Sequence, residues 1–161
     1  VIDALHDLKL DGVNVELNIF GFGKLEKYLK KLGEVSSQEV TFYDDENEDS
    51  LIEFYKNLDL FVMPAKSRFF GKEYEGLGLV YLEAASYGLP LLVGTSGGAF
   101  ETIIPGKTGF IVDSRKEIYD GVKFFAENIE EIENFGINSK KFVEEKFSWK
   151  STMEKFISEV N

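Results

Sequence analysis

Strand-like and helix-like hydrophobic patterns alternate along most of this 161-residue chain. Apolar and polar residues alternate with period two from Val15 to Phe20, and apolar residues then recur at helical spacing from Leu25 to Leu32. Further strands are expected at residues 40–43, 60–63, 90–93 and 110–112, and helices at 51–58, 79–87 and 98–104. Repeated alternation favours an α/β fold with a Rossmann-like, doubly wound parallel sheet, whose ligands bind beyond the carboxyl ends of the strands.

From residue 114 onward the pattern is helical throughout. Three apolar stripes recur at helical spacing, over residues 118–125, 132–143 and 149–160. Ser148 is the expected N-cap of the last helix. The stripe that begins at Trp149 favours packing in the core or against another domain over contact with a membrane. We expect one domain over residues 1–161, with no internal repeat or linker.

Composition excludes several classes of function. The chain has no cysteine and a single histidine, His6, so it offers neither thiolate nor multi-histidine metal sites. Its net charge of −11 would repel nucleic acid, and we expect no nucleic-acid partner. No apolar run is long enough to span a bilayer. We therefore expect a globular protein with no bound metal.

The segment from Glu75 to Glu83 carries the clearest chemical signal. Gly76 and Gly78 would let backbone amides approach a ligand closely, and a helix that starts here offers positive partial charge to a phosphate. The two carboxylates suit the hydroxyl groups of a sugar. Because apolar residues flank Glu83, we expect its carboxylate to be partly buried and paired. The alternative is that Glu83 is an ordinary surface residue of a helix.

Five motifs, in matching order and spacing, resemble the family 4 retaining glycosyltransferases (group 1) of the GT-B fold: Phe61–Pro64, Glu75–Ala84, Gly88–Pro90, Gly94–Glu101 and Gly106–Val112. The resemblance implies the C-terminal, donor-binding half of that fold without its first strand. It implies a hexosyltransferase of polysaccharide or glycolipid biosynthesis that uses a nucleoside diphosphate sugar, with no cofactor.

The same resemblance implies roles for single residues. Glu75 would be the catalytic residue, whose carboxylate contacts the hydroxyl groups of the donor sugar. Glu83 would hold the ribose of the nucleotide. The amides of Gly76, Leu77, Gly78 and Leu79 would meet the sugar and the diphosphate. The form of these motifs is closest to phosphatidylinositol mannosyltransferase-like members, which favours GDP-mannose as donor and leaves a UDP-sugar as the alternative.

Parts of the family pattern would lie before Val1. They are the first strand with its Arg and Lys, and the whole N-terminal acceptor domain, so we expect the chain by itself to be inactive. A cytoplasmic location at the inner face of the membrane, with peripheral membrane contact of the full-length protein, is a further expectation. A base pocket is expected around Tyr43, Asp44 and Met63, although the acidic loop after Tyr43 leaves the mode of base recognition open.

A small group of cations precedes Glu75. Lys66, Arg68 and Lys72 would attract a phosphate of the donor or acceptor, or a lipid headgroup. The alternative is a solvated loop whose cations offset the charge of Glu73 and Glu75.

Two other readings belong to different classes of function. Gly21-Phe22-Gly23 follows a strand, and Asp44 comes about twenty residues later, which resembles an NAD(P)-binding fingerprint. The third glycine position of that fingerprint is Glu26, which favours a plain strand–helix turn. The other alternative is a non-catalytic module that binds sugar nucleotides. The partial P-loop at 106–108 and the partial calcium loop at 45–49 lack required positions and are interpreted as loops.

Overall fold

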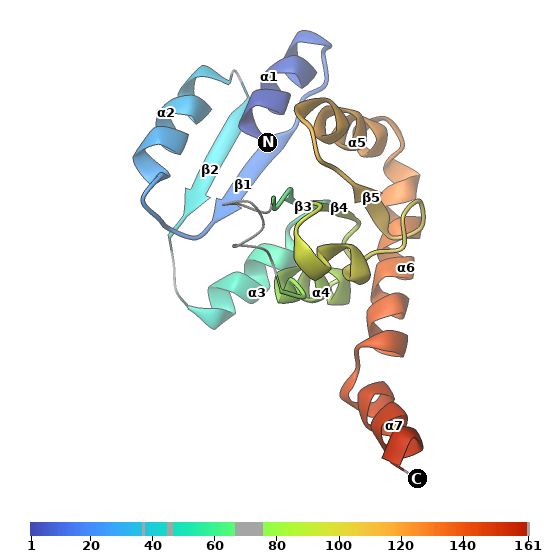
Figure 1. The fold of residues 1–161 in the computed structure, drawn as a ribbon. Helices are drawn as coiled ribbons and strands as arrows, with labels where there is room; N and C mark the ends of the chain where they lie inside the picture. Colours follow the sequence, from blue (N-terminus) through green and yellow to red (C-terminus); the bar gives the residue numbers. More distant parts are fainter. Residues whose placement is uncertain (37, 45–46, 67–75, 161) are drawn as a thin grey trace. The chain divides into compact units, whose positions relative to one another are not determined.

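The computed structural model describes residues 1–36, 38–44, 47–66 and 76–160 (Figure 1). The chain divides into two compact units. The first contains Val1–Leu58 and Ser114–Glu127, and the second contains Asp59–Asp113 and Asn128–Asn161. No helix within the described ranges is both long and apolar enough to cross a bilayer.

The first unit is a two-stranded parallel sheet with helices. Its elements are α1 (Ile2–Leu10), β1 (Glu16–Phe20), α2 (Glu26–Val35), β2 (Glu39–Tyr43), α3 (Glu48–Lys56) and α5 (Arg115–Glu127). The strands pair in register from Glu16 opposite Glu39 to Phe20 opposite Tyr43. Helix α2 lies beside β2 (Figure 1), where Gly33 faces Val40.

Ionic contacts tie α1 to α5, which lie side by side in Figure 1. Arg115 donates two hydrogen bonds to the carboxylate of Asp7, at 2.7 and 2.5 Å, and these bonds lower the pKa of Asp7. Asp11 accepts hydrogen bonds from Tyr119 and Lys123, which lower its pKa as well. A lowered carboxyl pKa stabilises the fold above the unfolded value of 3.8, and the contribution is lost as the pH falls through the folded value.

The second unit is a three-stranded parallel sheet with helices. Its elements are β3 (Phe61–Met63), α4 (Leu79–Ser86), β4 (Leu91–Val93), the 3₁₀ helix η2 (Gly97–Thr102), β5 (Gly109–Ile111), α6 (Ile129–Lys146) and α7 (Trp149–Val160). β4 is the central strand, paired with β3 on one side and β5 on the other. All three of its residues are fully buried, as expected for a central parallel strand.

Each unit has its own parallel sheet, with the order β1-β2 in the first unit and β3-β4-β5 in the second. Helices lie between paired strands along the chain, α2 between β1 and β2 and α4 between β3 and β4. The expected parallel α/β architecture is confirmed.

Most elements lie within two residues of their predicted bounds, and the predicted short helix at 98–104 is the 3₁₀ helix η2. Ser148 does cap α7, because its hydroxyl accepts a hydrogen bond from the amide of Ser151 at 3.2 Å. The expectation that the Trp149 stripe packs in the core is wrong. Trp149 is 85% exposed and Phe156 is 60% exposed, so none of the described residues covers these two side chains. Packing against another domain stays a prediction.

Helices α4 and α6 meet at a close backbone contact. Gly136 of α6 lies over Gly88, which follows α4, and a Cβ atom on Gly136 would stand 2.1 Å from the carbonyl oxygen of Gly88. That distance is far shorter than any real Cβ contact, so only glycine fits. The contact fixes α4, whose first turn forms the site described below.

Gly136→Ala is expected to destabilise the chain by about 1–3 kcal/mol, the usual cost of overpacking. In an unconstrained helix the same change would stabilise by about 0.5–1 kcal/mol, so the expected sign is reversed. Urea unfolding followed by circular dichroism measures the difference. Gly23→Ala is the control, because a Cβ atom there meets nothing within 4 Å. A stabilising Gly136→Ala substitution would contradict the contact.

Candidate functional site

At the carboxyl ends of the three parallel strands, one main-chain carbonyl group accepts hydrogen bonds from three different segments. The Met63 oxygen, at the end of β3, accepts hydrogen bonds from the Tyr81 hydroxyl at 2.7 Å and from the amides of Ala65 at 2.9 Å and Gly94 at 3.1 Å. These donors belong to α4, the loop after β3 and the loop after β4. One backbone atom therefore joins the three segments that border this edge.

Tyr81 fixes the position of α4. Its side chain is fully buried, and its ring packs edge-on against Phe61 of β3 with centroids 6.1 Å apart. Its hydroxyl reaches the Met63 carbonyl, so it holds α4 both by packing and by a hydrogen bond. Tyr81 is thus a positioning residue for the first turn of α4.

That first turn begins at a glycine in the left-handed region. Gly78 is the N-cap, with φ 74° and ψ 63°, a conformation that favours glycine. No described side chain caps the helix, so its first amide groups retain the capacity to bind an anion. Leu79, the first helical residue, is 64% exposed. The predicted helix start at Leu79 is confirmed.

The loop before α4 lies against the start of η2. The Gly98 amide donates to the Gly76 carbonyl oxygen at 2.8 Å. A Cβ atom on Gly98 would stand 2.5 Å from that same oxygen, so the close approach requires glycine. Gly94 makes a similar contact, because its Cβ atom would stand 2.1 Å from the carbonyl oxygen of Ala65. The loop before α4 and the start of η2 are therefore in direct backbone contact.

Glu83 lies in α4, one turn after Leu79. Its side chain is exposed, so the expectation of partial burial is wrong. Its flanking residues Ala84 and Ala85 are buried, but successive helical residues point in directions about 100° apart. Exposure leaves the carboxylate accessible to a ligand.

A polar cluster joins the ends of all three strands. Lys66 donates to the main-chain carbonyl of Asp113 and lies 3.2 Å from the Asp113 carboxylate. The Thr95 hydroxyl donates to the same carboxylate, also at 3.2 Å. Lys66 follows β3, Thr95 follows β4 and Asp113 follows β5. Of the predicted cations Lys66 therefore stands at the sheet edge, whereas Arg68 and Lys72 lie outside the described residues, as does Glu75.

The predicted base-pocket residues belong to different units. Met63 ends β3 in the second unit, and its described contribution is its carbonyl oxygen. Tyr43 ends β2 in the first unit, followed by the exposed Asp44. Tyr43 borders a cavity of about 320 Å³ with Phe20 and Phe54, and its ring packs against Phe54. The base pocket stays a prediction.

Two interactions at this edge have no local signal in the sequence. The Tyr81 hydroxyl donates to a carbonyl 18 residues earlier, and Lys66 pairs with Asp113 47 residues later. Lys66 itself was predicted as a cation near the site, but its partner was not. Over the part of the chain that the structure covers, no cluster of acidic and histidine residues could hold a metal ion.

Comparisons with known proteins agree with this arrangement. The model of the family described as "Glycosyl transferases group 1" matches residues 1–142. The GDP-mannose-dependent monoacylated alpha-(1-6)-phosphatidylinositol monomannoside mannosyltransferase of Corynebacterium glutamicum is 42% identical over 100 residues, 62% of this chain and 26% of that protein. The GDP-mannose-dependent alpha-(1-6)-phosphatidylinositol monomannoside mannosyltransferase of Mycolicibacterium smegmatis is 38% identical over 118 residues, 70% of this chain and 30% of that protein.

A solved structure shares the fold. Sucrose-phosphate synthase from Thermosynechococcus elongatus superposes with a TM-score of 0.77 at 20% identity, over 99% of this chain and 42% of that one. The chain spans about a quarter to a third of the length of the two curated relatives above. The likeness confirms the expected fold class, a Rossmann-like part of the GT-B fold.

Gly98→Ala is expected to destabilise the chain by about 1–3 kcal/mol, because the new methyl group would force the Gly76 carbonyl away. Gly76→Ala is the matched control at the other end of the same hydrogen bond, since a Cβ atom there meets nothing within 4 Å. Chemical unfolding of both variants measures the difference. Equal losses would show that the contact is not the steric constraint described.

Proposed function

Because this chain belongs to the glycosyl transferases group 1 family, we propose that it is the donor-binding part of a glycosyltransferase that transfers a hexose with retention of configuration. The donor is a nucleoside diphosphate sugar. The observation that carries the proposal is the uncapped start of α4 at Gly78, held beside η2 by the contact of Gly76 with Gly98. Amides at a helix start are suited to bind the diphosphate.

In the transfer, the bond between the sugar's anomeric carbon and the diphosphate oxygen would break, an acceptor hydroxyl oxygen would form the new bond to that carbon, and the hydroxyl proton would pass to the departing diphosphate. Negative charge grows on the departing diphosphate. The amides of Gly76, Leu77, Gly78 and Leu79, with the partial positive charge of α4, would stabilise that charge. Glu75 would orient the donor sugar through its hydroxyl groups.

Lys66 would add a cation to the same edge. Its ammonium group is anchored by Asp113 but its side chain is 57% exposed, so a ligand phosphate can reach it. Glu83 would bind the two ribose hydroxyls of the nucleotide, since its carboxylate is exposed one turn beyond the amides. A carboxylate accepts two such hydrogen bonds with favourable geometry.

GDP-mannose is the favoured donor. Two relatives, which are 42% and 38% identical to this chain, are named as GDP-mannose-dependent enzymes. A UDP-sugar is the second candidate donor. Tyr43, Asp44 and Met63 are the proposed base contacts. The acceptor would bind to a separate domain of the whole protein, at the inner face of a membrane.

The NAD(P)-binding alternative is not favoured. The amide of Gly21 donates to the carbonyl oxygen of Tyr43 at 2.8 Å, so it is already used within the sheet. The third glycine of a dinucleotide fingerprint allows close packing of helix on strand, and that position is Glu26 here. The turn at Gly21–Gly23 therefore fits a strand–helix connection.

Glu83→Gln is expected to weaken GDP binding by about 10- to 150-fold, which corresponds to the loss of one charge-assisted hydrogen bond worth about 1.5–3 kcal/mol. Isothermal titration calorimetry with GDP, UDP and NADH measures the affinities, and GDP is expected to bind best. The control is Glu133→Gln, an exposed glutamate of α6, with unchanged affinity. Unchanged GDP affinity of Glu83→Gln would refute the ribose role, and preferential NADH binding would refute the donor class.

A further inference from the structure

Exposed apolar side chains and lysines lie together on the outer face of α2 and on the turn that precedes it. Phe22 is 69% exposed, Leu25 58% and Tyr28 63%. Lys24, Lys27 and Lys31 are exposed as well, and among the described residues none of them has an ion-pair partner. We call these six residues the α2 surface. All of them belong to the first unit, so the surface is complete within it.

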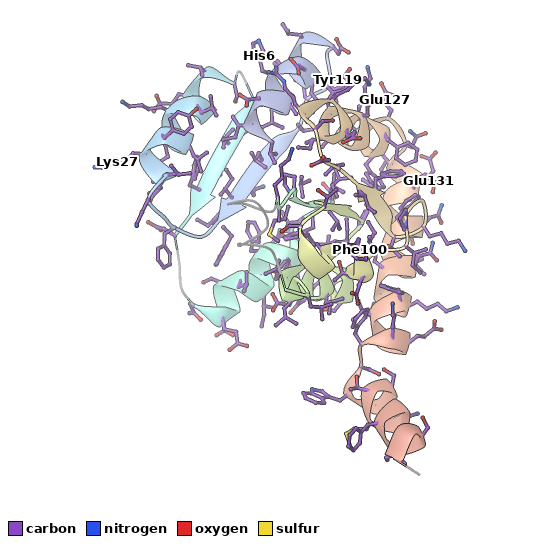
Figure 2. All side chains as sticks on the ribbon, viewed as in Figure 1. His6, Lys27, Phe100, Tyr119, Glu127 and Glu131 are labelled. Carbon is purple, nitrogen blue, oxygen red and sulfur yellow. The ribbon has the colours of Figure 1, made fainter. Side chains whose placement is uncertain are left out.

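Most of the α2 surface faces away from the side of the helix that packs on the sheet, and Leu25, four residues before Leu29, lies at the border between the two sides. Gly33 is buried against Val40, with its Cβ position 3.2 Å from that side chain, and Leu29 is half-buried. Lys27 extends away from β1 and β2 (Figure 2). Residues three and four apart share a helix face, so Leu25 and Tyr28 form one row and Lys27 and Lys31 form the row beside it.

The remaining charges of α2 are accounted for. Lys30 is paired with Glu26 at 2.7 Å, lies 5.7 Å from the Phe42 ring and does not join the surface. Glu34 is exposed and follows Lys31 by three residues, so it is the acid of α2 that lies nearest to the lysines of the surface. From Lys24 to Leu32 the segment has four lysines and one glutamate, in a chain whose net charge is −11.

This local excess of positive charge determines the charge of the partner that the α2 surface can bind. At physiological ionic strength the Debye length is about 8 Å, so acids far from α2 are largely screened at close range. The lysines then dominate the potential next to the helix. An anionic surface is therefore the complementary partner, although the chain as a whole is acidic.

The apolar side chains favour a lipid bilayer over a nucleic acid or another polyanion as the partner. Leucine has no aromatic face on which a nucleic-acid base could stack, whereas the headgroup region of a bilayer takes up leucine, phenylalanine and tyrosine alike. From this juxtaposition we propose that the α2 surface binds an anionic lipid bilayer, with Phe22, Leu25 and Tyr28 at the headgroup boundary and the three lysines on lipid phosphates.

The test is co-sedimentation of the 161-residue chain with vesicles of phosphatidylglycerol and phosphatidylcholine in equal parts, and with phosphatidylcholine alone. Binding to the anionic vesicles only is expected. The triple variant Lys24→Gln/Lys27→Gln/Lys31→Gln should lower the partition coefficient on the order of 100-fold, or about fivefold per lysine. The matched control, Lys107→Gln/Lys140→Gln/Lys150→Gln, removes the same charge from exposed sites of the second unit and should stay near the wild-type value.

A second pair of variants tests the apolar row. Leu25→Ser/Tyr28→Ser should lower binding on the order of tenfold, because less apolar area is then taken from water. Ile129→Ser/Ile137→Ser, at exposed positions of α6, is its control. Circular dichroism spectra verify that the variants remain folded.

Three outcomes would overturn the proposal. The first is a wild-type chain that does not sediment with anionic vesicles. The second is an equal loss of binding in the α2 variants and their controls. The third is binding to a single-stranded oligonucleotide that depends on the lysines but not on Leu25 and Tyr28, without binding to vesicles, which would assign the lysines to a polyanion.

Discussion

The arrangement of the site depends on backbone segments that approach more closely than side chains would allow. The Gly98 amide reaches the Gly76 carbonyl at 2.8 Å, and a single added carbon at Gly98 would stand 2.5 Å from the same oxygen. Gly94 against Ala65 and Gly136 against Gly88 follow the same rule. These contacts set the position of α4. Its first amide groups can therefore face a ligand because the contacting residues are glycines, which have no Cβ atom.

The sheet provides the frame for that contact. β4 is buried on all sides between β3 and β5, and the Met63 carbonyl collects donors from α4 and the two neighbouring loops. Parallel strands place all their carboxyl ends at one edge, which is where an open α/β sheet binds ligands. Lys66, held by Asp113, gives this edge a cation in an otherwise acidic chain.

Much of the fold follows from the sequence, because strand and helix periods are local signals. The N-cap at Ser148 and the helix start at Leu79 were predictable from residue type and spacing. The position of the Trp149 stripe was not, since amphipathicity says which face is apolar but not what covers it. The burial of Glu83 was misjudged because its apolar neighbours in sequence point elsewhere around the helix.

Contacts between distant residues account for the rest of the site. The hydroxyl of Tyr81 reaches Met63, and Lys66 reaches Asp113, through the topology of the sheet and not through any motif. Met63 was predicted to border a base pocket, which stays a prediction, and its described contact is a carbonyl oxygen that accepts hydrogen bonds. The sequence predicts a site at the carboxyl ends of the strands, but the hydrogen bonds that join the segments at that edge could be identified only from the structure.

The most direct test of the account is the response of single backbone amides to the ligand, measured by nuclear magnetic resonance of the ¹⁵N-labelled chain titrated with GDP. If the start of α4 binds the diphosphate, the amide signals of Gly76, Leu77, Gly78 and Leu79 should shift most, with Gly98 beside them. Unshifted signals there, with the largest changes at Gly21–Gly23, would contradict the account.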